Sequence, residues 1–330
     1  MEKGNVILGV DVSKNTLDFC CARRGIHIRT GNDSKGFALL GKWCRQEGID
    51  LKATLFVLEY TGGYEYRFLQ YCQSRGYRYC RIPGMEIKRS MGMVRGKSDR
   101  ADSFRIGRYG EEKSARLDPE KPLNTNFIRL KQLLAFRKRL VRENAGYKTS
   151  VKERQTMYPG LRKDELVRIS KEKIRANNRY IEKIEREIME IIQGDQDMQV
   201  NYRLITSVKG IGRINACMTI AYTENFTSFT DARKYAVYVG VIPFERTSGI
   251  SIRGRKRVSH LANKELKQEL NQAAKSAIVH DDEIGTYAQR KLECKPYPLV
   301  LNNVKFKLIL RMFSVVKRKK EYIKNYRSVA

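Results

Sequence analysis

The stretch NVILGVDVSKNTLDFCCARRGIHIRT, residues 5–30, decides the fold of this chain. It contains three short runs rich in apolar residues, over residues 5–12, 16–23 and 26–30, and an Arg24-Gly25 turn separates the last two. Short apolar runs bounded by turn residues are typical of β-strands. The stretch therefore predicts a three-stranded meander, in which neighbouring strands run antiparallel.

Alternating helices and strands are expected after the meander. The expected helices cover residues 35–46, 64–75, 85–93 and 99–109, and the expected strands cover residues 54–59 and 77–82. Ser34 is expected to cap the first of these helices, and Gly76 to end the second. This is the element order of an RNase H-like domain, an α/β fold whose first strand pairs in parallel with the fourth across a right-handed crossover.

Four acidic residues stand at the ends of these predicted elements: Asp11, Glu59, Asp99 and Asp102. Asp11 and Glu59 end strands that should lie side by side, where open α/β sheets place ligands. Asp99 and Asp102 are three residues apart and share one helix face. A chain with formal net charge +30 has little electrostatic reason to gather carboxylates unless a cation lies between them and a polyanion. The pattern predicts a Mg²⁺ or Mn²⁺ site for phosphodiester chemistry.

Each acidic residue also has an ordinary structural interpretation. Asp11 fits a turn, and Glu59 fits a solvated strand end. Asp99 and Asp102 fit a helix cap and an ion-pair partner of a nearby arginine. For any one residue alone the ordinary interpretation is the commoner, but four such residues in one topology favour the metal site.

The composition is that of a globular, strongly basic protein. Hydrophobic residues make up 41% of the 330 residues, and no apolar run approaches the roughly 18 residues of a membrane span. The seven cysteines form no CxxC pair and the three histidines lack zinc-ligand spacing, so we expect reduced thiols and no zinc. The excess of Lys and Arg favours nucleic acid as the partner. We expect a cytoplasmic, nucleoid-associated protein with no membrane partner.

The middle of the chain predicts a pair of long helices. They are expected over residues 126–155 and 166–193, separated by Pro159-Gly160. Apolar residues recur at heptad-like spacing in both, at Leu130, Leu133, Leu134, Leu140 and Val141 in the first and at Ile174, Ile181, Ile184, Ile188 and Ile191, with Asn177, in the second. The pattern predicts an antiparallel coiled-coil hairpin. Packing within the chain and an oligomer contact fit this seam equally well.

The last part of the chain is expected to be mainly helical. A helix running into Gly210-Ile211-Gly212 and then a second helix, over residues 214–223, is the helix-hairpin-helix pattern. Backbone N–H groups at the start of the second helix can meet a phosphate without reading a base. A tight turn between helices with no ligand has the same sequence. Another helix is expected over residues 229–239.

A candidate nucleophile follows in a predicted loop. Ser248 stands beside Gly249, and a basic run follows it. A hydroxyl next to a glycine and close to several cations fits a nucleophile held against a DNA backbone. A serine beside a glycine is also a common turn. Together the patterns predict three domains, over residues 1–125, 126–195 and 196–330.

These motifs, in this order, resemble the DEDD insertion-sequence transposases of the IS110 type, a group that includes the Piv-type DNA invertases. The motifs are GVDVSK at 9–14, LEYTG at 58–62, KSDRADS at 97–103, GIG at 210–212, GVIP at 240–243 and TSG at 247–249. The resemblance covers essentially the whole chain. Small departures are Ser98 where the family usually has Thr, Ser103 where it usually has Ala, and Ile82-Pro83 where Asn-Pro is common.

The resemblance implies a RuvC-like domain, a coiled-coil region and a C-terminal transposase domain carrying a serine. Asp11, Glu59, Asp99 and Asp102 would hold the metal, and Ser248 would attack DNA to give a phosphoserine, with Thr247 and Ser251 as close rivals. The implied partners are donor and target double-stranded DNA, a structured non-coding bridge RNA and further copies of the chain, as a dimer or tetramer. Nucleic-acid contacts are expected from Lys14, Lys97, Arg100, Lys209, Gly210, Gly212, Arg213, Arg253, Arg255, Lys256 and Arg257.

We therefore expect a DNA transposase or recombinase guided by a bridge RNA. A site-specific invertase of the same family would use the same residues. A RuvC-like nuclease or junction resolvase would hydrolyse DNA with water and would not need Ser248. A non-catalytic RNA-binding protein would not need the four carboxylates. No GxxxxGK[ST] loop is present, so no nucleotide-driven motor is indicated.

Overall fold

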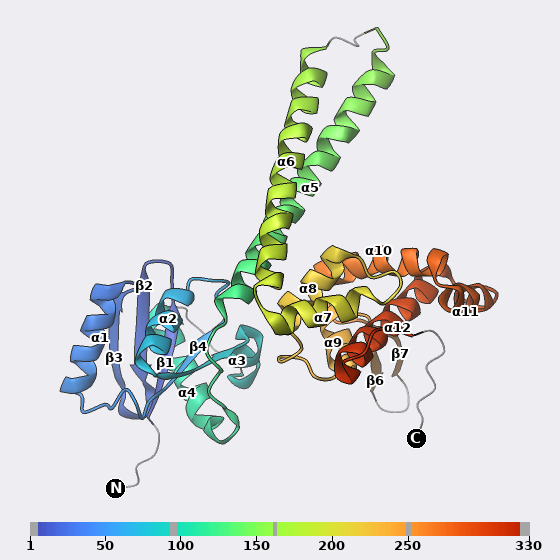
Figure 1. Ribbon diagram of the computed structural model, residues 1–330. Helices are drawn as coiled ribbons and strands as arrows, with labels where there is room; N and C mark the ends of the chain where they lie inside the picture. Colours follow the sequence, from blue (N-terminus) through green and yellow to red (C-terminus); the bar gives the residue numbers. More distant parts are fainter. Residues whose placement is uncertain (1–5, 93–97, 161–163, 249–251, 324–330) are drawn as a thin grey trace. The chain divides into compact units, whose positions relative to one another are not determined.

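The computed structural model describes residues 6–92, 98–160, 164–248 and 252–323. The chain divides into two compact units, Met1–Leu123 and Asn124–Ala330. Figure 1 labels the elements of both. The expected division into three domains stays a prediction.

The first unit contains a five-stranded mixed sheet in the order β3-β2-β1-β4-β5. Its strands are β1 (Ile7–Val12), β2 (Thr16–Cys21), β3 (Ile26–Gly31), β4 (Leu55–Glu59) and β5 (Arg78–Ile82). β1 pairs antiparallel with β2 and parallel with β4. The predicted meander and the crossover to a parallel strand are confirmed, and the sheet is consistent with an RNase H-like domain.

Helices cover both faces of this sheet. They are α1 (Ser34–Gln46), α2 (Tyr66–Arg75), α3 (Gly84–Ser90) and α4 (Asp99–Glu112), with short 3₁₀ turns η1 (Ala22–Arg24) and η2 (Ser114–Arg116). Because successive side chains of a strand point to opposite faces, Leu8 and Val10 of β1 pack in one cluster with α1 and α2. Ile7 packs in another cluster with α3 and α4. Both faces are therefore buried, which explains the continuous apolar runs in the sequence.

Glycines bring α4 into direct contact with β1. A Cβ atom on Gly9 would lie 2.3 Å from the backbone N of Gly107, and one on Gly110 would lie 2.8 Å from Cγ2 of Ile7. The later turns of α4 therefore lie over the start of β1, and the helix runs antiparallel to the strand. Its first turn, with Asp99 and Asp102, consequently reaches the end of β1 that carries Asp11.

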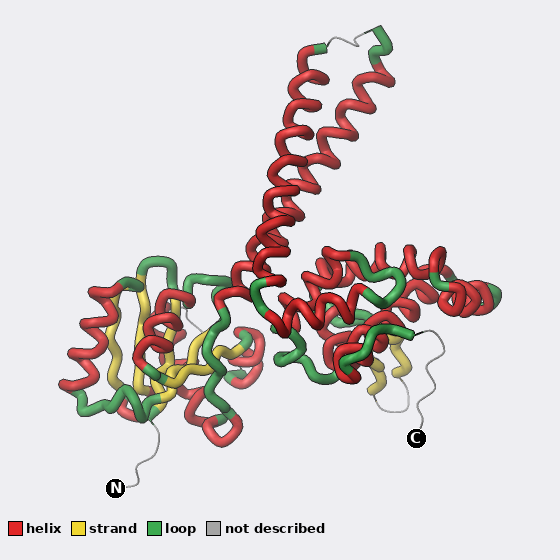
Figure 2. Tube along the Cα trace, in the orientation of Figure 1, coloured by secondary structure: helices red, strands yellow, loops and turns green. Residues whose placement is uncertain are grey.

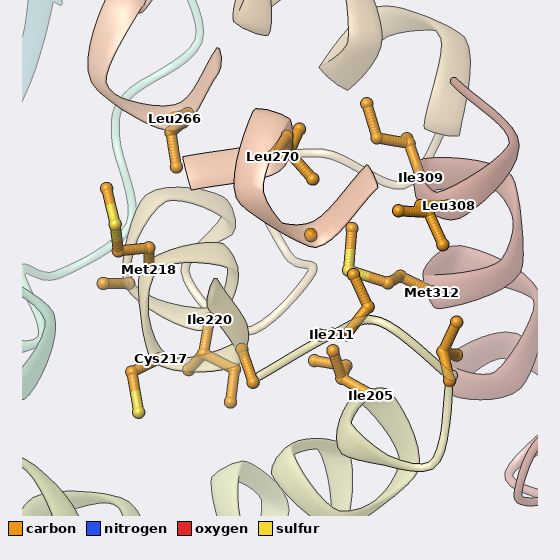
Figure 3. Packing of buried hydrophobic residues seen from close by; sticks show 14 of the residues in the cluster. Ile205, Ile211, Cys217, Met218, Ile220, Leu266, Leu270, Leu308, Ile309 and Met312 are labelled. Carbon is orange, nitrogen blue, oxygen red and sulfur yellow. The ribbon is translucent and has the colours of Figure 1, made fainter. Parts of the chain in front are cut away.

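The second unit is mainly helical (Figure 2). Its elements are α5 (Thr125–Met157), α6 (Glu165–Gln193), α7 (Gln196–Thr206), α8 (Arg213–Thr223), α9 (Ala232–Val239), β6 (Phe244–Ser248), β7 (Ile252–Arg257), α10 (Lys264–His280), α11 (Asp282–Leu292) and α12 (Tyr297–Arg318). Its core gathers residues from most of these helices. Figure 3 shows Ile205 of α7, Ile220 of α8, Leu270 of α10 and Met312 of α12 converging there.

The two long helices α5 and α6 pack against each other through the predicted apolar positions. Leu130, Leu133, Leu134 and Leu140 of α5 and Ile184 and Ile188 of α6 are buried. Val141 was expected in the same stripe, but its side chain is 42% exposed, so that assignment is wrong. One turn further along α5, polar side chains of the two helices meet instead. There Asn144 Nδ2 donates to Asn178 Oδ1 at 2.8 Å.

Several expected element ends are wrong by a few residues. Asp33, not Ser34, caps α1, because the Asp33 backbone is extended and its carboxylate accepts from the Gly36 N–H. β2 ends at Cys21 and continues as the turn η1. α2 begins at Tyr66, and α9 begins at Ala232 because Asp231 caps it. α3 ends at Ser90, shortly before Gly92 takes a positive φ of 66°.

All seven cysteines are free thiols, as expected, and six are buried packing residues. The expectation is wrong for Cys294, which is exposed rather than packed. Burial raises the pKa of the Cys20 thiol to about 12, so this thiol stays protonated, and it donates to the backbone oxygen of Ser103 at 2.9 Å. In the described ranges, every helix is too short or too polar to cross a membrane.

Candidate functional site

Asp11 and Glu59 lie next to each other at the carboxyl edge of the sheet. The β1–β4 register pairs Val10 with Leu58, so the next residues on the two parallel strands are Asp11 and Glu59. Asp11 is half-buried, and the two strands end here. The first two predicted carboxylates therefore come together as the topology requires.

Asp99 and Asp102 occupy the first turn of α4. The Ser98 hydroxyl accepts from the Ala101 N–H at 3.2 Å and caps the helix. The first turn of a helix favours negative charge, because its free N–H groups give it a partial positive charge. Both side chains consequently lie at the end of α4 that reaches Asp11.

The carboxylates around Asp11 raise its pKa. The pKa of Asp11 is raised to about 6, first by burial and then by the negative charges of Asp102, Asp99, Asp18 and Glu59. All three other predicted carboxylates thus contribute to the shift. Like-charge clusters of this kind are costly without a cation and are typical of functional sites.

A fifth carboxylate, Asp18, was missed in the sequence. Asp18 faces Asp11 in the β1–β2 register and is only 2% exposed. Its partners come from β3: the His27 ring contacts Asp18 Oδ1 at 2.8 Å, and Arg29 Nε donates to Oδ2 at 2.9 Å. The sequence did contain a signal for it, namely a charged residue inside an otherwise apolar strand. Such a charge is buried and therefore needs partners on a neighbouring strand.

Two arginines already neutralise part of the cluster. Arg29 Nη2 lies 2.6 Å from Asp99 Oδ2, and Arg105 Nη1 lies 2.6 Å from Asp102 Oδ1. Within the part of the chain that the structure describes, no three Asp, Glu, His or Cys side chains form a group that could hold a metal ion. The donor set nevertheless suits a hard cation, because Mg²⁺ and Mn²⁺ prefer carboxylate oxygens. An ion bound there would compete with Arg29 for Asp99 and with Arg105 for Asp102.

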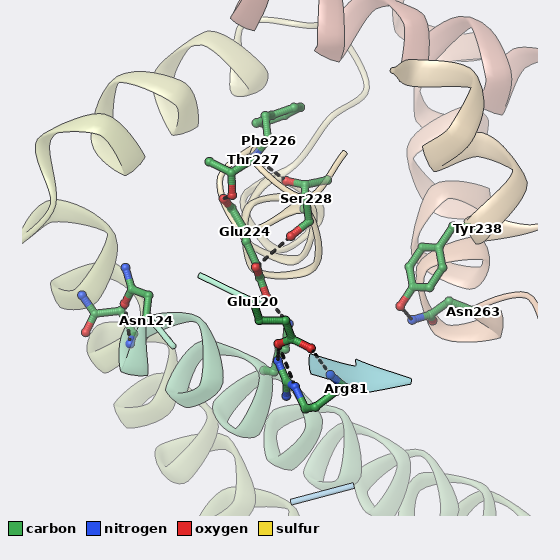
Figure 4. A network of polar contacts seen from close by, with 12 residues as sticks. Arg81, Glu120, Asn124, Glu224, Phe226, Thr227, Ser228, Tyr238 and Asn263 are labelled. Atoms are coloured by element: carbon green, nitrogen blue, oxygen red, sulfur yellow. Dashed lines mark hydrogen bonds and ion pairs between the residues drawn. The ribbon is translucent and has the colours of Figure 1, made fainter. Parts of the chain in front are cut away.

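The chain that follows Glu59 is fixed by a buried polar network. Glu65 is 1% exposed, and its Oε2 accepts from the Gly63 N–H at 2.8 Å and from the Thr61 hydroxyl. Arg81 donates to Glu120 Oε2 through Nε at 2.9 Å and Nη2 at 2.7 Å (Figure 4). This network, also missed in the sequence, holds the loop after β4 in place.

The predicted nucleic-acid contacts of the first unit lie around the carboxylates. Lys14 is exposed in the turn after β1, and Arg100 is exposed on the first turn of α4. Lys97 lies outside the described residues. The two described cations stand one to three residues from a predicted ligand, so they can meet phosphates next to the site.

The turn between α7 and α8 lines a cavity of about 480 Å³. Lys209 and Arg213 are exposed in this turn, and Arg213 lines the cavity. Gly212 is the N-cap of α8, and no described side chain caps the helix. Asn215 also lines this cavity, and its buried Nδ2 has no hydrogen-bond partner among the residues that the structure describes. Gly210 serves packing, because its φ is +92° and a Cβ would lie 2.6 Å from that of Ala277. The cavity is therefore lined by the uncapped start of α8 and by Arg213, which suit an anion, and also by the carboxylates of Glu185 and Glu269, which do not.

Ser248 ends a strand rather than lying in a loop as expected. β6 and β7 form an antiparallel hairpin in which Ser248 pairs with Ile252. The β-pattern was missed because four cations interrupt the apolar alternation of β7. Arg257 is exposed at its far end. Ser251 and the side chains of Thr247, Ser248, Arg253, Arg255 and Lys256 lie outside the described part of the chain.

Comparison with known proteins identifies the family. Residues 8–154 match the DEDD transposase domain of IS110, and residues 202–289 match the family described as Transposase IS116/IS110/IS902. The chain belongs to the IS110 family of transposases. It is a DNA recombinase, and the first match contains all four predicted carboxylates while the second contains α8 and the β6–β7 hairpin.

Two curated relatives are DNA-inverting proteins by name. The pilin gene-inverting proteins of Moraxella lacunata and Moraxella bovis are each 24% identical over 268 residues, which is 80% of this chain and 80% of the relative. The resemblance to this transposase family and its invertase relatives is thereby confirmed. The DEDD domain also indicates a divalent metal as cofactor of this transposase, without fixing which one.

Gly84 determines where the carboxylate of Glu59 can lie. A Cβ on Gly84 would be 1.8 Å from Glu59 Oε1, so Gly84→Ala must displace the tip of that flexible side chain. Because Glu59 is one of the expected metal ligands, we expect recombination to fall about 100-fold, a loss that a displacement of about 1 Å can cause. The unfolding temperature should stay within about 2 °C of wild type, since only a side-chain end moves.

Gly146→Ala is the matched control, because a Cβ there meets no described atom within 4 Å. Recombination rates and melting curves of both variants, measured side by side, check the expectation. Wild-type recombination by Gly84→Ala would show that the position of Glu59 is unimportant.

Proposed function

We propose that this transposase cuts and rejoins donor and target DNA through a phosphoserine intermediate, with Mg²⁺ or Mn²⁺ as cofactor and a bridge RNA as guide. The observation that carries the proposal is the carboxylate cluster around Asp11, whose pKa is raised to about 6 by burial and by the surrounding acidic side chains. In a chain of net charge +30, such a cluster is best explained by a cation that faces nucleic-acid phosphate.

Asp11, Glu59, Asp99 and Asp102 would hold the ion, which when bound would offset phosphate charge and lower the pKa of a nearby hydroxyl. Ser248 is the proposed nucleophile. Its Oγ forms a bond to phosphorus while the bond from phosphorus to one deoxyribose oxygen breaks, and the serine proton is transferred away as that oxygen takes one up. The phosphoserine ester keeps the bond energy, so attack by a second DNA hydroxyl reseals the strand without ATP.

The cavity at the start of α8 supports a second nucleic-acid contact. The α7–α8 turn is proposed to act as a helix-hairpin-helix, in which the N–H groups of α8 and the Arg213 side chain hold a backbone phosphate. Glu185 and Glu269 also line the cavity, and Arg137 Nε donates to Glu185 Oε1 at 2.6 Å. One of the two carboxylates is thus already neutralised by a cation.

Arg213→Ala should weaken nucleic-acid affinity without changing the preferred sequence. Removing one phosphate contact to duplex DNA should lower the slope of log affinity against log salt by about 0.9. Titrations at several salt concentrations measure this slope. Arg186→Ala, which removes an exposed cation from the last third of α6, is the control and should leave the slope unchanged. Equal losses in both variants would mean that Arg213 contributes only general charge.

A homo-oligomer is proposed to form through the outer halves of α5 and α6. Apolar side chains remain exposed there, among them Met157 at 69%, Tyr158 at 55% and Ile169 at 41%. Exposed apolar side chains on one element favour a protein interface. The proposed assembly is a dimer or a tetramer.

The decisive experiment offers the purified protein its co-purified RNA, donor DNA and target DNA, with and without EDTA. We expect joined products and a covalent protein–DNA adduct only when the divalent ion is present. Cut but unjoined ends would favour the RuvC-like nuclease that uses water. Inversion of a segment between two inverted sites, with no joining of separate molecules, would favour the invertase function that the names of the Moraxella relatives describe.

A further inference from the structure

A groove of about 510 Å³ runs along α4, next to the carboxylates. Ser90 and Met91 line it from the end of α3, and Arg100, Phe104, Arg105 and Arg108 line it from α4. Glu112, also in the lining, stands at the far end of the helix. The groove begins at the helical turn that carries Asp99 and Asp102.

An aromatic ring stands between two exposed cations in this groove. Arg100, Phe104 and Arg108 are spaced four residues apart, so they form one stripe along α4. Across the described ranges, no carboxylate forms an ion pair with Arg100 or Arg108. The stripe extends over about 12 Å, which corresponds to roughly three phosphates of one strand.

The Phe104 ring is partly exposed. The Arg100 guanidinium lies 6.0 Å from its centroid, at the outer limit of a cation–π contact, and the His27 ring lies 6.3 Å away. An aromatic ring adds little to a duplex backbone contact, because paired bases stack on one another. An unpaired base, in contrast, can stack on such a ring while cations on either side hold its phosphates.

We propose that this groove binds a single-stranded nucleic acid, with a base stacked on Phe104 and phosphates held by Arg100 and Arg108. The inference rests on the proposed function and specifies which form of nucleic acid the site receives. Arg105 lines the same groove and pairs with Asp102, so a strand in the groove is led directly to the carboxylates.

The test measures the fluorescence anisotropy of labelled oligo-dT, oligo-rU and a short duplex with the full-length Asp11→Asn protein. This background separates binding from strand cutting. Phe104→Leu, which keeps an apolar side chain but removes the ring, should weaken single-strand binding about 5- to 100-fold and duplex binding less than about 2-fold. Phe104→Tyr should restore single-strand binding.

Arg108→Ala should lower the salt slope for oligo-dT or oligo-rU by about 0.7. Arg67→Ala, an exposed cation on α2, is the matched control and should leave this slope unchanged. The oligonucleotide that loses more affinity in Phe104→Leu identifies the natural strand as DNA or RNA. Unchanged single-strand binding by folded Phe104→Leu, or an equal loss for the duplex, would overturn the proposal.

These readouts do not depend on recombination by the wild-type protein. Wild-type recombination combined with single-strand binding that is insensitive to Phe104 would reject only the groove. Intact groove binding without any metal-dependent strand exchange would reject only the proposed function.

Discussion

Asp11→Asn should abolish recombination and at the same time stabilise the metal-free protein. The substitution removes one oxygen ligand and one negative charge from a cluster in which every other predicted ligand raises the pKa of Asp11. We expect recombination to fall at least about 10³-fold, as when a central charge-stabilising group is lost from an active site. We also expect the unfolding temperature without metal to rise by about 4 °C, which corresponds to about 1 kcal/mol in a domain of this size.

The stabilisation should depend on pH in a defined direction. The pKa of Asp11 is about 6 in the folded protein and 3.8 as the reference value, so the folded state binds the proton more tightly. The stability that this proton contributes is complete below about pH 3.8 and is lost as the pH rises through about 6. The advantage of Asp11→Asn over wild type should therefore grow between pH 4 and 6.5 and then stay constant.

Melting curves across this pH range, recorded with EDTA and with Mg²⁺, check both parts of the prediction. Mg²⁺ should raise the unfolding temperature of wild type but not of Asp11→Asn. Asp118→Asn, an exposed carboxylate in the loop before α5, is the control and should behave like wild type. A Mg²⁺ response that survives in Asp11→Asn would refute the metal site.

Ser248→Ala should eliminate the covalent protein–DNA adduct while leaving DNA and RNA affinity within about 2-fold of wild type. Loss of a nucleophile removes the whole covalent route, so strand exchange should fall by at least about 10⁴-fold. Ser248 ends β6 beside Ile252 of β7, and alanine is compatible with this strand-end position. The hairpin should consequently persist in the variant, so that loss of chemistry is separated from loss of structure.

Denaturing gels of the protein incubated with labelled DNA and Mg²⁺ measure the adduct. Thr247→Ala and Ser251→Ala serve as the matched variants, because these hydroxyls stand within three residues of Ser248. Both should still form adduct. Adduct formation by Ser248→Ala, together with its loss in one neighbouring variant, would transfer the nucleophile to that residue.

Local patterns were sufficient for most of the elements. Strands β1 to β5 were predictable because both sheet faces are buried and their apolar runs are short and bounded by turns. Element ends were less predictable, because Ser34 and Asp33 are both good caps and only the backbone conformation at Asp33 decides between them. The β6–β7 hairpin was missed because its basic residues obscure the alternation that marks a strand.

The sequence by itself determined that Asp11 and Glu59 end two parallel strands and that Asp99 and Asp102 begin a helix, because these facts follow from local patterns and chain order. Only the tertiary structure decided that the helix reaches the strand ends, because that depends on Gly107 and Gly110 fitting against β1. It also decided that Asp18 joins the cluster and that Arg29 and Arg105 balance it. Contacts between residues far apart in sequence produce no periodic pattern in that sequence. Only the packing of the folded chain therefore reveals them.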